Sequence, residues 1–270
     1  MQMNVQILME DTCGNTECVY EHGLSVYIET RKHKILVDTG ATQAFLKNAQ
    51  QMGISLAEVD TVVISHGHYD HAGGVLDFCK LNSKAKIYMQ RAAGEDYYHG
   101  ERYIGIDKRI LDLPQLCLLE GDYRMDEELF LFTGITGRRS FPQSNLSLSK
   151  KNGDVLEQDS FAHEQCLVVT QGENHILFSG CAHNGILNIL DRYQQMFAKE
   201  PAAVVSGFHM MKKGEYTSEE EQVICATARE LAKKRTIFYT GHCTSQAAID
   251  LMQPIMGEKL HSIHCGQTLF

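Results

Sequence analysis

Residues 65–74 read Ser65-His66-Gly67-His68-Tyr69-Asp70-His71-Ala72-Gly73-Gly74, and a buried apolar strand over residues 59–65 leads into them. In an extended turn, His66 and His68 project to the same side and can bind one cation. Asp70 and His71, at the start of the helix that follows, can reach a second cation next to it. A polar turn capped by Asp70 is the plain structural alternative, but ligating side chains seldom gather so densely by chance. The stretch therefore predicts a site for two adjacent metal ions.

Strands and helices alternate on both sides of this stretch. Before it, residues 23–29 and 34–38 have the pattern of a hairpin, and residues 41–52 that of a helix. After it come a helix at 74–81 and a strand at 85–90. A second series follows, with strands at 166–170, 175–178, 202–206 and 236–240 and helices at 184–197, 218–235 and 245–256, the middle helix opening on a capping box of Ser218 and Glu221.

Residues 91–161 separate the two series and differ from both. They are rich in glycine, charge and tyrosine, with short strand-like runs at 115–119 and 129–133. We expect this segment to be rich in loops and to face the substrate. We expect the two β-rich series to face each other in one domain spanning residues 1–270, an α/β fold arranged as a four-layer αββα sandwich.

Composition excludes several classes of protein. Of 270 residues, 43% are hydrophobic and 22% are charged, which is typical of a folded globular chain. The net charge of −9 disfavours binding to nucleic acid or to an anionic membrane surface. Nothing resembles a signal peptide or a membrane span, so we expect a cytoplasmic protein. Nine cysteines, an odd number, do not suggest a disulfide framework.

The motif His-x-His-x-Asp-His is matched in full by His66, His68, Asp70 and His71, and on it the chain resembles the metallo-β-lactamase superfamily. The resemblance implies the same αββα sandwich. Residues 35–40, Ile-Leu-Val-Asp-Thr-Gly, resemble the family's early strand ending in Asp-x-Gly, which implies that Asp38 supports a metal-bound histidine. These six residues also resemble the active-site turn of retroviral aspartic proteases, but that site needs two such aspartates and the chain has one Asp-Thr-Gly.

The resemblance also implies later ligands. Leu177-Phe178-Ser179-Gly180-Cys181 resembles the strand that ends in the family's metal-bridging aspartate, but here a cysteine stands at that place. Some zinc β-lactamases bind the second metal through such a cysteine, so Cys181 is a candidate ligand, with a buried structural thiol as the alternative. His242, after the strand at 236–240, matches the last histidine of the family.

Two residues compete for the third histidine of the first metal. His163 precedes a strand and lies eighteen residues before Cys181, close to the family's usual separation. His183 belongs to a Gly-Cys-x-His-x-Gly motif that is typical of one subgroup. Both are retained as candidates, and either is otherwise a hydrogen-bonding or substrate-binding group beside the metals.

That subgroup is the archaeal dihydropterin synthase-like branch, which the chain resembles at residues 21–25, 180–186, 206–209 and 241–244. The branch is named for joining a dihydropterin-methyl diphosphate to a ribofuranosyl-aminobenzene phosphate in methanopterin synthesis. The resemblance places His22 and His209 near the pocket, where they are not counted as ligands.

The function that follows first is a metal-dependent hydrolase, in which a metal-bound hydroxide attacks an ester, thioester, lactone or phosphoester. Two zinc ions are expected, with iron or manganese as alternatives, and Asp70 would also orient the nucleophile. The second hypothesis is a transferase of the dihydropterin type, whose small-molecule substrate is phosphorylated or pterin-like. The third is a redox or non-catalytic metal-binding protein, although di-iron relatives usually carry Glu in place of His68 and an added flavin domain.

Overall fold

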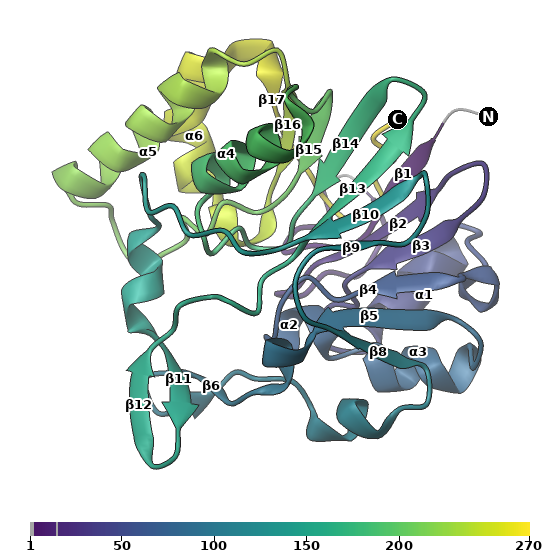
Figure 1. The fold of residues 1–270 in the computed structure, drawn as a ribbon. Helices are drawn as coiled ribbons and strands as arrows, with labels where there is room; N and C mark the ends of the chain where they lie inside the picture. Colours follow the sequence, from purple (N-terminus) through teal and green to yellow (C-terminus); the bar gives the residue numbers. More distant parts are fainter. Residues whose placement is uncertain (1–2, 15) are drawn as a thin grey trace.

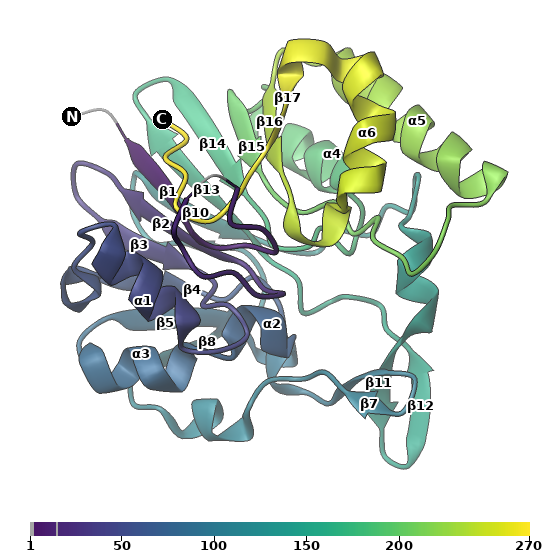
Figure 2. The same cartoon turned by 180° about the vertical axis from the view of Figure 1, so that it is seen from behind.

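The computed structural model describes residues 3–14 and 16–270, in which two large β-sheets pack face to face with helices on their outer faces (Figure 1). The α/β sandwich with four layers predicted from the sequence is confirmed. Seen from behind, α1 (Ala44–Gln51) and α3 (Val75–Leu81) cover one sheet, and the other is covered by α4 (Ile186–Phe197), α5 (Ser218–Ala232) and α6 (Gln246–Met256) (Figure 2).

The first sheet has six strands. In spatial order they are β1 (Asn4–Met9), β2 (Ser25–Glu29), β3 (Lys34–Val37), β4 (Thr61–Val63), β5 (Lys86–Gln90) and β8 (Leu116–Leu119). The strands β1, β2 and β3 pair antiparallel, whereas β3, β4, β5 and β8 run parallel. The helices α1 (Ala44–Gln51) and α3 (Val75–Leu81) connect the parallel strands.

The second sheet has seven strands. Their order is β17 (Leu260–Ser262), β16 (Ile237–Thr240), β15 (Ala203–Val205), β14 (Asn174–Phe178), β13 (Cys166–Gln171), β10 (Leu129–Phe132) and β9 (Tyr123–Arg124). Its parallel half is connected by α4 (Ile186–Phe197), α5 (Ser218–Ala232) and α6 (Gln246–Met256).

Alternating side chains build the layers. On β2, Val26 and Ile28 enter the core between the two sheets, whereas Tyr27 faces the helices on the outside. The same central core takes Leu167 and Val169 from β13. Because successive side chains of a strand point to opposite faces, each strand contributes to two apolar layers at once.

A third, smaller sheet projects from the body of the molecule (Figure 1). It is formed by β12 (Val155–Gln158), β11 (Leu148–Asn152), β6 (Tyr97–His99) and β7 (Arg102–Tyr103), all within the segment expected to be loop-rich. The sequence analysis did not assign these strands. All four side chains of β12 are exposed, so no alternation of buried and exposed residues marks the strand in the sequence.

Smaller differences concern ends of elements. The capping box of α5 lies one residue earlier than predicted, because Thr217, not Ser218, has the extended backbone of a helix cap. Its hydroxyl accepts a hydrogen bond from the Glu220 backbone N–H, and the Glu220 carboxylate accepts one from the Thr217 N–H. The run Thr-Ser-Glu-Glu-Glu contains two overlapping registers of this motif, and the sequence alone does not choose between them.

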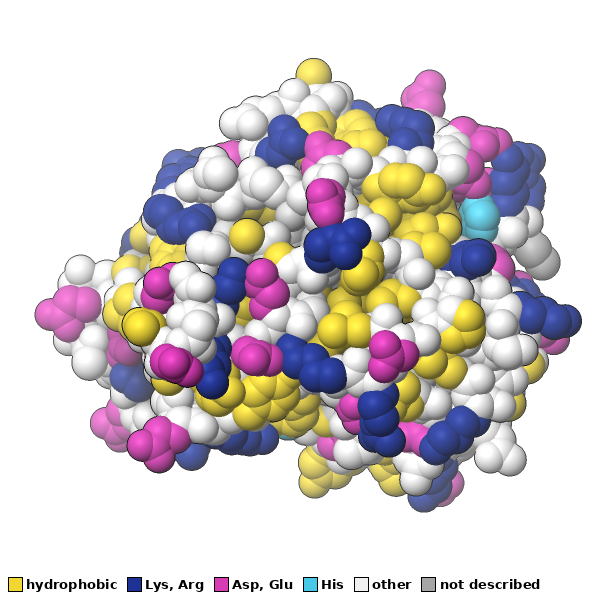
Figure 3. Space-filling view, turned by 60° about the horizontal axis from the view of Figure 1, so that its bottom comes forward, with side chains coloured by type: hydrophobic (Ala, Val, Ile, Leu, Met, Phe, Trp, Pro, Cys, Tyr) yellow, Lys and Arg dark blue, Asp and Glu magenta, His cyan; other side chains and the backbone are white. Residues whose placement is uncertain are grey.

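The face shown in Figure 3 carries hydrophobic side chains interrupted by acidic and basic ones, so neither sign of charge dominates it. Among the helices of residues 3–14 and 16–270, none has the length and hydropathy needed to cross a membrane.

A histidine between two acids links the hairpin turn of β2 and β3 to the turn before β10. His33 Nδ1 lies 3.0 Å from Asp60 Oδ1, and Nε2 lies 2.7 Å from Asp126 Oδ2. Burial alone would lower the pKa of His33, but the hydrogen bonds with Asp126 and Asp60 outweigh it and raise this pKa above its usual value.

This arrangement predicts a pH-dependent contribution to stability. A raised pKa in the folded state means that His33 stabilises the fold fully below the unfolded pKa, about 6.5, and that the contribution is lost as pH rises through the folded pKa. We expect His33→Gln to lower the free energy of unfolding by about 1 kcal/mol at pH 5.5 and by clearly less at pH 9. The free energy of unfolding is measured by urea titration of the metal-free protein at both pH values. His261→Gln, at an exposed histidine, is the control. An equal loss at both pH values would contradict the assignment.

Candidate metal centre

The candidate ligands gather where strands of both large sheets end. His66 follows β4, Cys181 follows β14 and His242 follows β16. Since parallel strands end at the same edge of a sheet, side chains far apart in the chain meet there. The stretch after β4 becomes the short helix α2 (Tyr69–Ala72), with Asp70 and His71 in it, as the sequence suggested.

One group of imidazoles consists of His66, His68 and His183. Their ring centroids lie 4.6 Å apart for His66 and His68, and 4.8 Å apart for each of the other two pairs. His66 Nε2 and His183 Nε2 are 3.2 Å apart. All three side chains are buried.

Hydrogen bonds determine which nitrogen of these rings carries the proton. The Ser65 hydroxyl donates to Asp38 Oδ2 at 2.7 Å, so it can only accept from His66 Nδ1–H at 2.8 Å. His183 Nδ1–H donates to Asn145 Oδ1 at 3.0 Å. In both rings Nε2 is therefore left with a lone pair, and the two lone pairs face each other.

The second group consists of Asp70, His71 and His242. His71 Nε2 lies 3.2 Å from His242 Nε2 and 3.5 Å from Asp70 Oδ2, while His242 Nε2 lies 3.3 Å from the same oxygen. His71 Nδ1–H donates to Asp38 Oδ2 at 2.7 Å, so its Nε2 also presents a lone pair. The predicted support of a candidate metal-binding histidine by Asp38 is thus seen at His71.

Cys181 lies between the two groups. Its Sγ is 3.1 Å from His71 Nε2, and it lies close enough to share a metal ion with His66 and His183 on one side and with Asp70, His71 and His242 on the other. The family's bridging aspartate has the same place between two metals. A thiolate there would be shared by both cation positions.

These groups fit metal ions. The facing lone pairs of His66 Nε2 and His183 Nε2, 3.2 Å apart, repel each other unless a cation lies between them. His71 Nε2 and His242 Nε2 are also 3.2 Å apart. Two ligands about 2.0–2.1 Å from one tetrahedral zinc ion stand close to that distance. His68 Nε2 is also buried without a hydrogen-bond partner within the described part of the chain. Imidazole, carboxylate and thiol together are the donor set that zinc prefers.

The electrostatics of the two groups differ. Burial, followed by the neighbouring imidazoles, holds the pKa values of His66 and His183 well below the usual range, so these rings stay neutral and able to bind metal. Burial opposes a charge on His242 as well, but hydrogen bonds to Asp11 and Asp70 raise its pKa well above the usual value. The acids around the second group therefore attract positive charge.

His163 is held differently from His183. Its Nδ1 accepts a hydrogen bond from the Gly67 backbone N–H at 2.9 Å, and its Nε2–H donates to Asp159 Oδ2 at 3.0 Å. Neither nitrogen is left with a free lone pair, so this geometry favours His183 over His163 as the third histidine. His163 lies behind His68, with ring centroids 5.4 Å apart.

Acidic side chains that the sequence analysis did not single out hold the ligand loops. Glu10 accepts a hydrogen bond from the His242 backbone N–H, and Asp11 Oδ1 accepts one from His242 Nδ1–H at 2.7 Å. The buried Glu164 accepts hydrogen bonds from the backbone N–H groups of His183 and Asn184, at 2.6 and 2.9 Å. No local motif marks these residues, because their partners are distant in the sequence.

Removing the charge of Asp11 should weaken the second cation position. In Asp11→Asn the amide cannot accept from His242 Nδ1–H as strongly as the carboxylate, so the ring is less well oriented and less basic. We expect zinc to bind this position about 10- to 100-fold more weakly, as measured by competition with a chelator. The exposed Glu17→Gln serves as the control, and an unchanged affinity in Asp11→Asn would refute the assignment.

His22 and His209 lie at the site, as the resemblance suggested. His22 is partly exposed, bonds through Nδ1 to Asp11 Oδ2 at 2.8 Å and points Nε2 at Asp70 Oδ2, 3.4 Å away. The ring of His209 lies against that of His183, with centroids 4.1 Å apart. Burial, and then His242, lower the pKa of His209 to about 3, so this ring is neutral.

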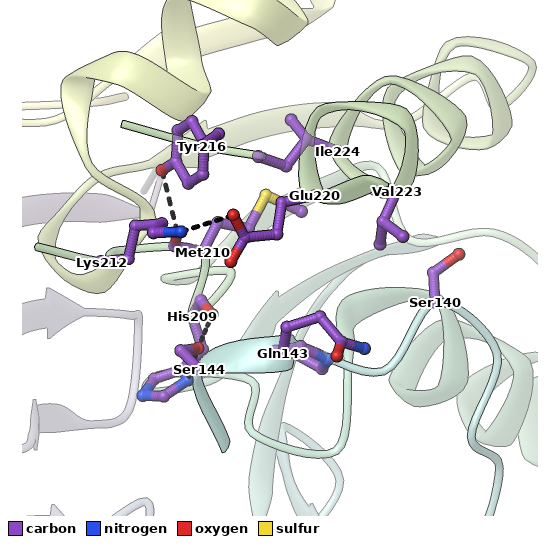
Figure 4. Close-up of a pocket in the computed structure, with 11 residues that line it drawn as sticks. Ser140, Gln143, Ser144, His209, Met210, Lys212, Tyr216, Glu220, Val223 and Ile224 are labelled. Atoms are coloured by element: carbon purple, nitrogen blue, oxygen red, sulfur yellow. Dashed lines mark hydrogen bonds and ion pairs between the residues drawn. The ribbon is translucent and has the colours of Figure 1, made fainter. Parts of the chain in front are cut away.

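A cavity of about 100 Å³ adjoins His209 between α5 and the turn that contains Ser144 (Figure 4). An ion pair between Lys212 and Glu220, 2.5 Å apart, crosses it. The other residues that line it are Ser140, Pro142, Gln143, Met210, Tyr216, Val223 and Ile224.

Comparisons with known proteins agree with this architecture. A family model described as the metallo-beta-lactamase superfamily matches residues 20–138. The solved structure of Tm1679, described as a metal-dependent hydrolase of the beta-lactamase superfamily, superposes with a TM-score of 0.84 and is 30% identical in sequence. It covers 100% of this chain, which in turn covers 99% of that structure.

Two relatives come from Methanocaldococcus jannaschii. An uncharacterized protein is 27% identical over 214 residues, which is 77% of this chain and 79% of the relative. The 7,8-dihydropterin-6-methyl-4-(beta-D-ribofuranosyl)-aminobenzene-5'-phosphate synthase is 24% identical, and the match covers 99% of this chain and 96% of the synthase.

Proposed function

Since the chain belongs to the metallo-β-lactamase superfamily, we propose that it is a metal-dependent hydrolase of a small molecule with an ester, thioester, lactone or phosphoester bond. One observation carries the proposal, namely that two pairs of imidazole nitrogens face each other on either side of a single thiol. Apolar packing does not require imidazole nitrogens to face each other in this way. Two cations, one between each pair of nitrogens, would account for the arrangement.

We assign the ligands by geometry. His66 and His183 would hold one ion and Asp70, His71 and His242 the other, with Cys181 contributing to both. His68, whose ring lies 4.6 Å from that of His66 and 4.8 Å from that of His183, is added to the first ion because it belongs to the family motif. His163 is left out, because both of its nitrogens are engaged in hydrogen bonds. The thiol in place of a carboxylate favours zinc over manganese or magnesium.

When bound, two zinc ions supply Lewis acidity, which activates water near neutral pH and polarises the bond under attack. The chain's own residues would orient the reactants. Asp70 turns Oδ2 toward His71 and His242, and its carboxylate can accept a hydrogen bond from the attacking water. Asp38 and Asp11 hold the rings of His71 and His242 by their Nδ1–H groups.

Zinc-dependent turnover tests the proposal. The protein is stripped with a chelator, reloaded with zinc and offered a panel of esters, thioesters, lactones and phosphodiesters. We expect turnover of at least one class that is absent before reloading and absent in His66→Ala. No zinc-dependent turnover of any member would reject the hydrolase.

A transferase of the dihydropterin type is the second candidate, and the full-length match to the synthase supports it. The two arginines at 138 and 139 differ in availability for a phosphate group. Arg139 pairs with Asp191 at 3.0 Å and with Glu230 at 3.5 Å. Arg138 makes hydrogen bonds to oxygens of Gly137, Asn184 and Ser160 and lies over the Phe141 ring, and no carboxylate of the described residues is paired with it. Fluorescence titration with a dihydropterin and with a phosphorylated aromatic amine tests this candidate, and failure to bind either would reject it.

A further inference from the structure

The ring of His209 lies against that of the candidate ligand His183, with centroids 4.1 Å apart, but His209 belongs to neither group of candidate ligands. Its Nδ1 lies 2.7 Å from the Ser144 hydroxyl, and that hydroxyl lies 2.5 Å from the His209 carbonyl oxygen. A carbonyl oxygen can only accept, so Ser144 donates its single proton there and accepts from His209 Nδ1–H. An imidazole that donates from Nδ1–H presents a lone pair at Nε2. No hydrogen bond to Nε2 of His209 is found within residues 3–14 and 16–270.

Asn145, the neighbour of Ser144 in the sequence, orients the ring of a candidate ligand in the same way. Ser144 and Asn145 follow each other in the short helix η4 (Gln143–Ser147), and Asn145 accepts the Nδ1–H of His183. One turn of chain thus orients two imidazoles whose rings lie 4.1 Å apart. Figure 4 shows Ser144 beside the His209 ring, which extends away from Lys212, Tyr216 and Glu220.

The backbone at His209 is unusual for a residue with a side chain. Its φ of 48° lies in the left-handed region, which is costly outside glycine. Two contacts hold it there, since the His209 N–H donates to Cys243 Sγ at 3.3 Å and the Met211 N–H donates to the Cys243 carbonyl at 2.8 Å. Strain of this kind persists where the surrounding structure requires a side chain in one place.

We propose that Nε2 of His209 accepts a hydrogen bond from an N–H or O–H group of the substrate, and that Ser144 is the positioning residue that keeps this nitrogen free. The inference rests on the proposed function. It narrows the substrate class to an ester, thioester or lactone that carries an amide N–H or a hydroxyl near the bond that breaks. The ionised oxygens of a phosphoester only accept hydrogen bonds and would leave Nε2 facing another acceptor.

Two lactones that differ in one group provide the test. The probe α-acetamido-γ-butyrolactone carries an N–H, and α-acetoxy-γ-butyrolactone carries an oxygen in its place. Each is titrated into the zinc-loaded protein by saturation-transfer NMR, and ring opening is followed separately by proton release. We expect the amide to bind about tenfold more tightly than the ester, because the ester leaves the acceptor unpaired.

Variants connect this preference to His209. His209→Phe, which has no acceptor, and Ser144→Ala, which releases the ring, should abolish the tenfold preference, whereas Ser144→Thr keeps the hydroxyl and should retain it. The exposed His261→Phe is the control, and the zinc content of every variant is measured to show that the centre is intact. If His209→Phe fails to fold, the Ser144→Ala and Ser144→Thr pair decides.

Three results would overturn the inference. The unmodified protein could bind the amide and the ester with equal affinity, or it could fail to bind the amide. The third is a preference for the amide that survives both His209→Phe and Ser144→Ala. Failure of the proposed function gives a different result. In that case the amide still binds selectively, but neither lactone nor any member of the hydrolysis panel is turned over.

Discussion

Asp70→Asn should lower kcat/KM by about 10³-fold or more, and it should lower the zinc content by about one of the two ions that we propose. Asp70 Oδ2 stands 3.3 Å from His242 Nε2 and 3.5 Å from His71 Nε2. The amide of Asn is uncharged and a poor zinc ligand, so the cation loses its acidic partner and the attacking water loses its acceptor.

The matched control for this change is Asp154→Asn, an exposed aspartate in the turn between β11 and β12. It makes the same chemical change away from the candidate centre and should leave both activity and zinc content unaltered. Zinc is measured by atomic absorption after gel filtration, and kinetics are measured with the substrate that the panel identifies. Full zinc content together with full activity in Asp70→Asn would remove Asp70 from the centre.

Zinc should raise the melting temperature of the chelated protein by roughly 10 °C or more. Free zinc at 1,000 times its Kd contributes about 4.1 kcal/mol per site to the folded state, and 1 kcal/mol shifts the melting temperature by about 2–4 °C in a domain of nearly this size. The structural reason is the repulsion between the facing lone pairs of His66 and His183, which a cation relieves, and the acids Asp70 and Asp11 around His71 and His242, which attract a cation.

Magnesium provides the control for this stabilisation. It prefers oxygen ligands and octahedral geometry, so a site built mostly of imidazole and thiol should gain little from it. Calorimetry of the chelated protein with each metal at the same free concentration measures the two shifts. A melting temperature that zinc leaves unchanged, or that magnesium raises equally, would contradict the presence of a zinc centre.

The sequence was most informative where chemistry and local pattern coincide. The elements around residues 66–71 follow from alternation of apolar residues, and the structure places β4 and α3 within a few residues of the expected bounds. His66, His68, Asp70 and His71 are neighbours in the sequence, so their meeting needed no knowledge of the fold. His242 and Cys181 needed the family resemblance, which located them after two later strands.

What the sequence left open depends on contacts between distant residues. His163 and His183 were equivalent candidates, and the distinction comes from one backbone N–H, that of Gly67, which occupies a nitrogen of His163. Asp11 could not be foreseen as a partner of His242, because 231 positions separate them in the chain. The small sheet around β11 was missed for another reason, since exposed strands are defined by pairing rather than by burial.

One carboxylate makes the two halves of the centre interdependent. Asp38 receives the Ser65 hydroxyl, which sets the proton position on His66, and it also receives the His71 ring directly. A single fully buried carboxyl group therefore orients one candidate ligand at each cation position, His66 and His71. On the proposed assignment both ions would depend on this carboxyl group, so a substitution of Asp38 would weaken the binding of both rather than of one alone.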